Sequence, residues 1–330
     1  MRHLIDWQSL SDEVWHAAVD RALYHAERAG EWTDAARGRS IALMFFNPSL
    51  RTRTSMELAA AQMGAYSTTL TPGRETWAFA FDAGTVMDGE EAEHIREAVG
   101  VLSGYFDAIG VRLFASQKHY QQDREERLIR TFSAASSVPV INLESAFYHP
   151  CQALADAAVV RQQLGDPRGR KFVLTWAYHP RALPMAVPNS AVLMAARSGM
   201  DVVVARPEEY ALDYGVMELA RSYGVRVEET AQREEAYRDA DVVYAKAWGG
   251  PVVYSDPDHE ASLRQSLRDW CVTEHWMSRT NRGFFMHCLP VRRNVVVDDA
   301  VLDGPRAIHL QQAAFRLHAQ KAILEYVWGL

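Results

Sequence analysis

Short runs of apolar residues alternate with amphipathic stretches along the chain. In its first part, three runs have the length and composition of buried strands, and the stretches between and after them have the 3.6-residue spacing of helices. The predicted strands are residues 40–46, 106–114 and 138–143, and the predicted helices include residues 53–63 and 152–164. The first of these helices ends at Gly64, a residue type that often terminates helices.

The same alternation restarts near Pro150. The predicted strands there are residues 172–176, 200–205, 225–227, 241–245, 284–287 and 307–310, and the predicted helices are residues 190–197, 210–223 and 313–327. Strands that alternate with helices are typical of parallel sheets covered on both faces. We therefore predict an α/β fold with two domains, each with a mainly parallel sheet flanked by helices, and a cleft between them.

The composition is that of a soluble globular protein. Of 330 residues, 48% are apolar and 23% charged, so the chain can bury a sizeable core. Lys and Arg total 35 and Asp and Glu total 42, which gives a formal net charge of -7. This balance argues against a surface that coats nucleic acid and leaves room for a local basic site that binds a small anion.

Two further features predict a cytoplasmic protein. The three cysteines, Cys151, Cys271 and Cys288, are too few for a disulfide framework and fit a reducing compartment. Acidic residues such as Asp6 and Asp12 interrupt the apolar positions near the N-terminus, so no secretory signal is expected there. No run is long enough to predict a membrane-spanning helix.

Polar residues follow four of the predicted strands. They occupy residues 47–53, Arg112, residues 144–152 and residues 287–293. In open α/β sheets, ligands bind at the carboxyl ends of the strands. These four segments are therefore the candidate ligand-binding segments.

The segment FFNPSLRTRTS, residues 45–55, is the clearest candidate for an anion site. A strand leads into a helix that begins near Ser49 or Leu50, whose first turn offers free backbone N–H groups. Arg51 and Arg53 add guanidinium groups suited to phosphate oxygens. A capped helix with two solvent-facing arginines is the alternative. Neither a Walker A pattern nor G-x-G-x-x-G follows a strand, which favours a small phosphate compound over ATP or NAD.

Three motifs occur in register with this domain plan: S-L-R-T-R at residues 49–53, H-P-C-Q at 149–152 and H-C-L-P at 287–290. In this order and at these separations they closely resemble the aspartate/ornithine carbamoyltransferase superfamily, and the resemblance covers nearly the whole chain. It implies a carbamoyl-phosphate-binding domain over residues 1–150, joined by the C-terminal helix at about 313–330, and an amino-acid-binding domain over residues 151–312. It also implies a homotrimer with shared active sites and no metal or organic cofactor.

The resemblance implies a role for each matching residue. The residues matched to carbamoyl phosphate are Ser49, Leu50, Arg51, Thr52, Trp77, Arg112, His149, Gln152, Cys288, Leu289 and Arg316, and those matched to catalysis are Arg51, Thr52, Arg112 and His149. Cations among them suit the departing phosphate, and His149 matches a donor to the carbamoyl oxygen. Trp77 matches a residue that closes over the substrate across a subunit boundary.

Each of these residues, taken singly, also has an ordinary structural explanation. Arg112 could pair with an acid, and Cys288 could be an inert core thiol. His149 and Cys151, with His287 and Cys288, could indicate zinc, but there is no C-x-x-C pair and the spacings are poor for a structural site. The ordered trio of motifs favours the carbamoyltransferase interpretation, with no metal.

The segment VVYAKAWGG, residues 242–250, bears on the amine acceptor. Ornithine carbamoyltransferases carry an Asp there, followed by Ser-Met-Gly, and the acid pairs with the free α-ammonium of ornithine. Here Lys246 stands at that position, and it would repel an α-ammonium. The chain therefore resembles the N-acylornithine branch, whose substrates have a neutral, blocked α-amino group. Residues 174–190 resemble that branch's proline-rich loop, which implies a knotted backbone.

Within that branch, Glu144, His179 and Lys246 match residues that bind the acylornithine, and residues 85–94 match the loop that reads the acyl group. The acetyl type carries Glu and the succinyl type Pro at the position of Ala92, so this chain matches neither. Val296 stands where the acetyl type carries a functional Lys. The succinyl type, like this chain, has an apolar residue there. Arg292 is then the candidate partner of a succinyl carboxylate.

The balance of these matches predicts carbamoyl transfer from carbamoyl phosphate to the δ-amine of N-succinyl-L-ornithine rather than N-acetyl-L-ornithine, in arginine biosynthesis. Acetyl-type features, such as the segment NPSLRTRTS, keep the acetyl and plain ornithine acceptors as alternatives. The δ-amine, with a pKa of roughly 10, must lose a proton before it attacks, and the phosphate is a candidate base. A non-catalytic phosphate-ligand-binding protein and a nucleotide-dependent oxidoreductase are alternatives that the three motifs and the missing glycine fingerprint disfavour.

Overall fold

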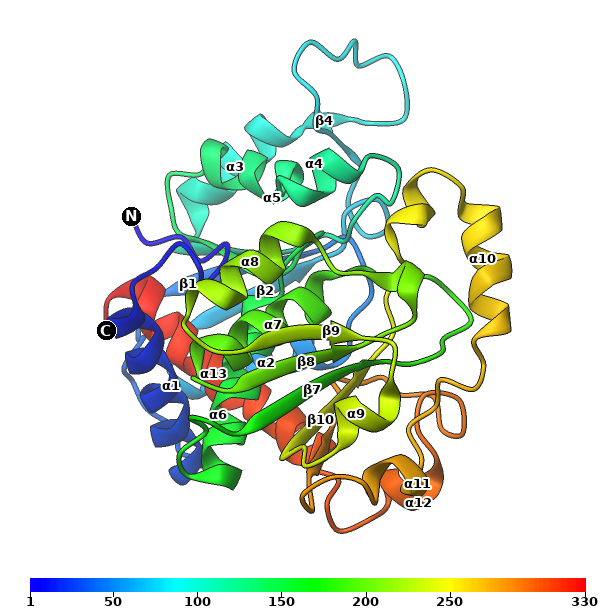
Figure 1. Cartoon of the computed structure of the whole chain (residues 1–330). Coiled ribbons are helices and arrows are strands. Elements are labelled where there is room, and N and C mark those ends of the chain that lie inside the picture. The colour runs from blue at the N-terminus through cyan, green and yellow to red at the C-terminus, as the bar shows by residue number, and fades with distance from the viewer. The chain divides into compact units, whose positions relative to one another are not determined.

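The structure is a computed structural model that describes residues 1–330. The chain divides into two compact units (Figure 1). The N-terminal unit comprises Met1–Ser116, Gln121–Ala158 and Phe315–Leu330, and the C-terminal unit comprises Gln117–Tyr120 and Val159–Ala314. The boundary near the middle of the chain falls inside helix α6 (Pro150–Leu164), whose first residue is the predicted division point.

A four-stranded parallel sheet forms the centre of the N-terminal unit. Its strands, in the order β2-β1-β5-β6, are β1 (Ser40–Phe45), β2 (Tyr66–Leu70), β5 (Ala108–Arg112) and β6 (Val140–Glu144). Leu4 extends the outer edge of β6, because its N–H donates to the carbonyl of Val140 at 2.8 Å and its carbonyl accepts from the N–H of Asn142 at 2.8 Å. The parallel pairing of these four strands confirms the prediction of a mainly parallel sheet in this half of the chain.

Helices cover this sheet, and two short strands lie beyond it. The helices are α1 (Asp12–Glu27), α2 (Arg51–Gln62), α3 (Ile95–Tyr105), α4 (Tyr120–Arg124), α5 (Arg127–Ala135) and α13 (His309–Trp328), and the short strands are β3 (Phe79–Ala80) and β4 (Glu93–His94). Figure 1 shows α1 and α13 side by side, although they come from opposite ends of the chain. Arg21 of α1 joins them through two hydrogen bonds to Glu325, at 2.8 and 2.6 Å, and His25 lies 3.0 Å from the same carboxylate.

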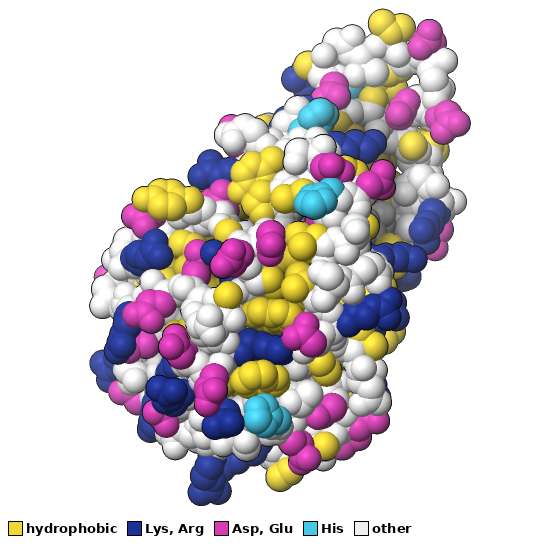
Figure 2. All heavy atoms as spheres, turned by 45° about the vertical axis from the view of Figure 1, so that its right-hand side comes forward, with side chains coloured by type: hydrophobic (Ala, Val, Ile, Leu, Met, Phe, Trp, Pro, Cys, Tyr) yellow, Lys and Arg dark blue, Asp and Glu magenta, His cyan; other side chains and the backbone are white.

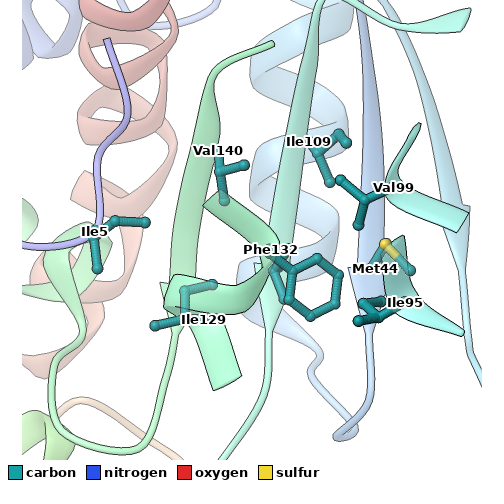
Figure 3. Close-up of a cluster of buried hydrophobic side chains, with 9 residues drawn as sticks. Ile5, Met44, Ile95, Val99, Ile109, Ile129, Phe132 and Val140 are labelled. Carbon is teal, nitrogen blue, oxygen red and sulfur yellow. The ribbon is translucent and has the colours of Figure 1, made fainter. Parts of the chain in front are cut away.

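One apolar core cluster of the N-terminal unit lies between the sheet and helices α3 and α5. Figure 3 shows its apolar side chains turned toward one another, among them Met44 of β1, Ile109 of β5, Val99 of α3 and Phe132 of α5. All four have 0% of their surface exposed. Burial of side chains of this size stabilises the fold by about 1.5–3 kcal/mol each and fixes the strands whose ends carry the candidate site.

A five-stranded parallel sheet forms the centre of the C-terminal unit. Its strands, in the order β11-β10-β7-β8-β9, are β7 (Lys171–Trp176), β8 (Asp201–Ala205), β9 (Val227–Thr230), β10 (Val242–Lys246) and β11 (Phe284–Met286). The helices are α7 (Ala186–Arg197), α8 (Tyr214–Ser222), α9 (Arg233–Tyr237), α10 (Pro257–Ser266), α11 (Glu274–Met277) and α12 (Asp299–Leu302), with 3₁₀ turns η1 (Glu208–Tyr210) and η2 (Pro251–Tyr254). Right-handed crossovers between parallel strands place α7 and α8 on one face and α9 on the other.

Aromatic side chains lock the loop after β10 to the sheet. The indole of Trp176 donates to the carbonyl of Trp248 at 2.9 Å, and the indole of Trp248 donates to the carbonyl of Tyr210 at 3.0 Å. The chain passes so close at Gly250 that a Cβ there would lie 2.4 Å from the carbonyl oxygen of Glu209. This loop therefore has little freedom next to the end of β10.

The structure differs from the sequence prediction at three places. Residues 307–310 do not form a strand: Ala307 makes a single bridge to Phe285, and α13 begins at His309. The predicted helix 210–223 begins only at Tyr214, because Asp213 caps it by accepting from the N–H of Val216 at 3.2 Å. Strand β2 was not predicted, since its sequence YSTTL is polar and lies at the sheet edge.

Two further features are the apolarity of the helices and the distribution of charged side chains on the surface. No helix of the structure combines the length and apolarity that crossing a membrane requires. Figure 2 shows one face of the molecule, on which Lys and Arg side chains are interspersed with Asp and Glu rather than gathered into one basic area. On that face, acidic and basic side chains are mixed.

Candidate functional site

The N-terminal sheet has a topological switch point between β1 and β5. The chain leaves β1 for β2 on one side, then crosses back over β1 to reach β5 on the other. Ligands bind where the connections from the carboxyl ends of adjacent strands diverge in this way. Asn47 spans the two strand ends, because its side-chain oxygen accepts from the N–H of Phe114 at 2.8 Å. The segment with the predicted anion-binding residues therefore begins at the switch point.

Helix α2 begins directly at this point. Ser49 caps its first turn, since its hydroxyl accepts from the N–H of Thr52 at 3.2 Å. The first turn also carries the positive end of the helix dipole, which favours a bound anion. Arg51 is the first residue of α2, whereas Arg53 is exposed and pairs with Glu57 at 3.1 Å. The two arginines of the motif thus have different surroundings, and Arg53 is paired on the surface.

Arg316, from the far end of the chain, is buried against the same turn. Its guanidinium donates to the hydroxyl of Thr52 at 2.9 Å and to the side-chain oxygen of Gln152 at 2.7 Å, and only 3% of its surface is exposed. Asp156 fixes Gln152 in turn by accepting from its amide at 2.7 Å. Burial lowers the pKa of Arg316, which reflects the cost of holding this cation away from water. Three elements that are remote in sequence, α2, α6 and α13, therefore converge on one buried cation.

A second buried cation, Arg112, ends β5. Its guanidinium forms an ion pair with Glu144, whose carboxylate also lies 3.4 Å from Nε2 of His149. The pairing of β5 with β6 shifts register at this point, and Glu144 has the unusual backbone angle φ of +151°. Such irregularities re-aim side chains and are frequent next to active sites. The irregularity here brings the carboxylate of Glu144 to Arg112.

Both buried arginines retain an unsatisfied donor. The Nε–H groups of Arg112 and Arg316 are buried and have no hydrogen-bond partner in the structure. A buried charged donor without a partner is costly, so such groups are frequent where a ligand completes the network. Two cations with spare donors, next to a helix N-terminus, can hold a small anion with several oxygens. The cluster made by Thr52, Arg112, Glu144, His149, Gln152 and Arg316 is called the buried cation cluster below.

Cys151 is next to this cluster in sequence but has a different character. It is completely buried, and burial raises the pKa of its thiol to about 11. Since the thiolate is the reactive form, this cysteine is an uncharged packing residue at neutral pH. No group of three or more His, Cys, Asp or Glu side chains in the structure is arranged to hold a metal ion.

The C-terminal sheet has its own switch point, between β7 and β10. The chain steps outward from β7 to β8 and β9 and then returns across β7 to β10. Lys246 is the last residue of β10, and His179 follows three residues after the end of β7. The predicted acceptor-binding residues of this unit therefore lie at the place where the topology favours a ligand.

His179 lies within hydrogen-bond distance of Arg292 and of the backbone of Arg181. Its Nε2 accepts from Nε of Arg292 at 3.1 Å, and its Nδ1 lies 2.9 Å from the carbonyl oxygen and 3.0 Å from the backbone nitrogen of Arg181. Burial, with smaller contributions from the cations Arg292 and Lys246, lowers the pKa of His179. The cations Arg292 and Lys246 beside this histidine suit a ligand that carries carboxylates.

The H-C-L-P motif follows β11 and is held by backbone contacts. The N–H of His287 donates to the side chain of Gln312 at 2.9 Å, and the N–H of Leu289 donates to Nδ1 of His287 at 2.9 Å. Leu289 has a left-handed backbone, with φ of +57°, and Cys288 and Leu289 are half-buried. The motif therefore adopts a specific turn at the carboxyl end of its strand, where its carbonyl groups can accept hydrogen bonds.

Trp77 and Ala92 lie apart from the buried cation cluster. Trp77 is 58% exposed, and its indole donates to Glu93 at 2.7 Å. Ala92 is exposed at the end of a long segment, residues 82–91, that is exposed throughout. Figure 1 shows this segment as a cyan loop that projects beyond β4. Within one chain, these two predicted residues do not join the others.

Sequence reasoning missed three buried residues that organise the site. Asp156 orients Gln152 from one helical turn away, a spacing that could have indicated the contact. Asn142 is a fully buried polar residue inside an otherwise apolar strand, which was also a visible signal. Glu126 is 2% exposed and accepts hydrogen bonds from Phe147 and Tyr148, but nothing in its local sequence distinguishes it from neighbouring surface acids.

Comparison with known proteins shows which family the chain resembles. The family model described as aspartate/ornithine carbamoyltransferase, carbamoyl-P binding domain, matches residues 2–162, and the model for the Asp/Orn binding domain matches residues 185–327. The chain is 42% identical to an N-acetylornithine carbamoyltransferase of Xanthomonas campestris pv. campestris, over 100% of this chain and 98% of the relative. It is 35% identical to an N-succinylornithine carbamoyltransferase of Bacteroides thetaiotaomicron, over 97% and 94% of the two chains.

A solved structure is equally similar. It is an N-acetyl-L-ornithine transcarbamylase with a glutamate-to-alanine replacement, in complex with carbamyl phosphate and N-succinyl-L-norvaline. The TM-score is 0.95 at 42% sequence identity, and the match covers 99% of this chain and 100% of the other.

Proposed function

The chain belongs to the aspartate/ornithine carbamoyltransferase family and is a carbamoyltransferase, and from this premise we propose that it carbamoylates the δ-amine of an Nα-acylated L-ornithine. N-Succinyl-L-ornithine is the favoured acceptor over N-acetyl-L-ornithine, carbamoyl phosphate is the donor, and the products are an N-acylcitrulline and phosphate. The observation that carries the choice of acceptor is Lys246 at the end of β10. Plain ornithine is the alternative acceptor that this residue disfavours.

The donor occupies the N-terminal unit. The first turn of α2, with Ser49, Leu50, Arg51 and Thr52, holds the phosphate, and the free donors of Arg112 and Arg316 add to it. Such cations stabilise the charge that the phosphate gains as it leaves.

The carbamoyl group is held at its other end. His149 and Thr52 polarise the carbonyl oxygen, which becomes an oxyanion when the amine attacks. Gln152 and the carbonyl groups of Cys288 and Leu289 accept from the carbamoyl NH₂, and this orients the carbon toward the amine. The amine attacks as a neutral group, and its proton passes to the departing phosphate or to solvent.

The acceptor is selected by charge. A free α-ammonium next to Lys246 would be repelled, whereas an acylated nitrogen is neutral and leaves one α-carboxylate to be paired. The cations Lys246 and Arg292 supply that pairing, and His179 and Glu144 contribute polar contacts. Arg292 is exposed enough to reach a second carboxylate, that of a succinyl group.

The succinyl preference rests on two positions and a relative. Ala92 places no negative charge where the acetyl type carries glutamate, and Val296 is buried, with 2% exposure, where the acetyl type carries lysine. The similar transcarbamylase that has a glutamate-to-alanine replacement is itself in complex with N-succinyl-L-norvaline. Removal of one like charge favours a ligand with an additional carboxylate.

The proposal also includes the oligomeric state, the metabolic pathway and the cellular compartment. A homotrimer with shared active sites accounts for Trp77 and Ala92, because an exposed loop that projects from its own unit can reach a neighbouring copy. The reaction places the protein in arginine biosynthesis by way of blocked intermediates, in the cytoplasm. A knot in the backbone around residues 174–190 remains a prediction of the resemblance.

The two arginines of α2 provide a matched test of the donor site. Arg51→Ala removes a cation from the proposed phosphate site, so phosphate release with N-succinylornithine should fall by at least about 100-fold while thermal unfolding is unchanged. Arg53→Ala removes an equal charge two residues away from a surface pair, and activity should stay within about threefold of the original. Equal activity of the two variants would refute the assignment of Arg51.

The exposed loop provides a matched test of acyl selection. Ala92→Glu introduces a negative charge at the position that reads the acyl group, so the ratio of kcat/KM for succinylornithine to that for acetylornithine should fall by about 10-fold or more. Ala83→Glu adds the same charge to the same exposed loop and should leave the ratio unchanged. An unchanged ratio in both variants would remove Ala92 from the account.

A further inference from the structure

The loop between β6 and α6, residues 145–148, joins two members of the buried cation cluster. Glu144 precedes the loop and His149 follows it. The loop folds back on itself, because the N–H of Ser145 donates to the carbonyl of Tyr148 at 3.0 Å. The separation of Glu144 and His149 therefore depends on the conformation of this loop.

Glu126 binds the inside of this loop from the start of α5. One of its carboxylate oxygens, Oε1, accepts from the N–H of Phe147 at 3.0 Å, from the N–H of Tyr148 at 2.9 Å and from the hydroxyl of Ser145. Glu126 is 2% exposed, and its own backbone is left-handed, with φ of +57°. A single buried oxygen thus collects three donors from the segment that ends at His149.

Asn142 holds the other end of the same loop. Its side-chain oxygen accepts from the N–H of Glu144 at 3.0 Å, and its amide donates to the hydroxyl of Ser145 at 2.7 Å. Ser145 therefore bridges Asn142 and Glu126, and the loop is enclosed by one connected network. Buried networks with every member satisfied fix one conformation strongly.

We propose that Glu126 is a positioning residue for carbamoyl transfer, which holds the loop so that the His149 imidazole meets the carbamoyl oxygen. This inference rests on the proposed function, because the contact of His149 with substrate is part of it. Glu126 lies outside the phosphate site: its hydrogen bonds go to the loop and not to α2. Its loss should therefore impair the chemical step more than the binding of carbamoyl phosphate.

The chemistry of the site explains why an acid stands at this position. The surroundings of Glu126 disfavour its charge, because burial raises its pKa to about 7. The chain nevertheless has an acid at this position. An apolar side chain would avoid that cost and would leave the N–H groups of Phe147 and Tyr148 without their acceptor. Displacement of a positioned group by about 1 Å can cost about 100-fold in rate.

Three variants separate positioning from general loss of structure. Glu126→Ala removes the acceptor, and we expect kcat to fall about 100-fold while KM for carbamoyl phosphate stays within about threefold. Glu126→Gln keeps an oxygen acceptor and should restore kcat to within about fivefold of the original. Glu325→Gln, which breaks a pair at the far end of α13, should lower the thermal unfolding midpoint without changing kcat.

The kinetic results of these variants can contradict the positioning role of Glu126. A kcat of Glu126→Ala near that of the original chain, or a rise in KM that matches the fall in kcat, would overturn it. If Glu126→Ala does not fold, Ser145→Ala decides, since it removes one of the three donors and should lower kcat about 10-fold with KM unchanged; an unchanged kcat overturns the inference.

Crystal structures separate failure of this inference from failure of the proposed function. They are needed for Glu126→Gln and for one alanine variant, either Glu126→Ala or Ser145→Ala, whichever folds. Absence of transfer by the unaltered chain with every acylornithine refutes the proposed function. The position of His149 relative to Arg112 still decides whether Glu126 positions it: a shift in the alanine variant, with the original position kept in Glu126→Gln, is the expected result. An unmoved His149 in the alanine variant overturns the inference.

Discussion

The buried carboxyl group of Glu126 predicts a specific dependence of stability on pH. Its pKa rises from the ordinary 4.5 to about 7, chiefly because burial disfavours the charged form. Between these values the folded chain holds a proton at Glu126 that the unfolded chain has released. The free energy of unfolding therefore falls as pH rises through this window, and above pH 7 the loss is complete. The difference between 4.5 and 7, at about 1.4 kcal/mol per pH unit, gives about 3 kcal/mol.

Glu126→Gln isolates this contribution, because glutamine has a similar shape and does not titrate. Urea unfolding of both chains, followed from pH 4.5 to pH 7.5, should show the original chain losing about 3 kcal/mol relative to the variant. Groups that titrate equally in both chains cancel in the difference. A difference that stays flat to within about 1 kcal/mol, or that changes in the opposite direction, would refute the reasoning.

Three further predictions concern stability and acceptor binding. Glu325 behaves oppositely to Glu126, because its two basic partners outweigh the effect of burial and hold its pKa at about 2. Its contribution to stability is therefore present above pH 4.5 and is lost as pH falls through 2. Glu325→Gln should lower the free energy of unfolding in urea by about 1–2 kcal/mol at pH 7 and by little at pH 2. Gly250→Ala places a Cβ 2.4 Å from the carbonyl of Glu209 and should lower the unfolding free energy by about 2 kcal/mol or more, whereas Gly100→Ala, in open space within α3, should raise it by about 1 kcal/mol. Lys246→Met should raise KM for the acylornithine about 10-fold or more in steady-state assays, with KM for carbamoyl phosphate unchanged.

Local patterns predicted the parts of the fold whose signals are themselves local. The run SIALMFF and the Ser49 cap marked β1 and the start of α2, and the rule that ligands bind at strand ends selected Arg112, whereas Lys246 was identified through the resemblance to a family. The run at residues 307–310 was misassigned because four residues, AIHL, are too few to show the periodicity that separates a strand from a helix start. Tertiary position decided that segment.

The contacts that build the site come from remote segments, and no local pattern contains them. Arg316 reaches Thr52 across 264 positions of the chain, and Glu126 reaches Tyr148 across 22. The resemblance to a family indicated the residue types at the site, but the pairing of Glu144 with Arg112 and the network around Ser145 are visible only in the folded structure. Buried polar contacts of this kind are fixed by the packing of whole elements.

An acceptor assay with the unaltered chain tests directly which amine the protein carbamoylates. Carbamoyl phosphate is supplied with N-succinylornithine, N-acetylornithine or ornithine, and the citrulline-type product and phosphate are measured together. We expect the highest kcat/KM with N-succinylornithine, a lower value with N-acetylornithine, and no product above background with ornithine. Product from free ornithine alone would contradict the role given to Lys246 and, with it, the proposed acceptor.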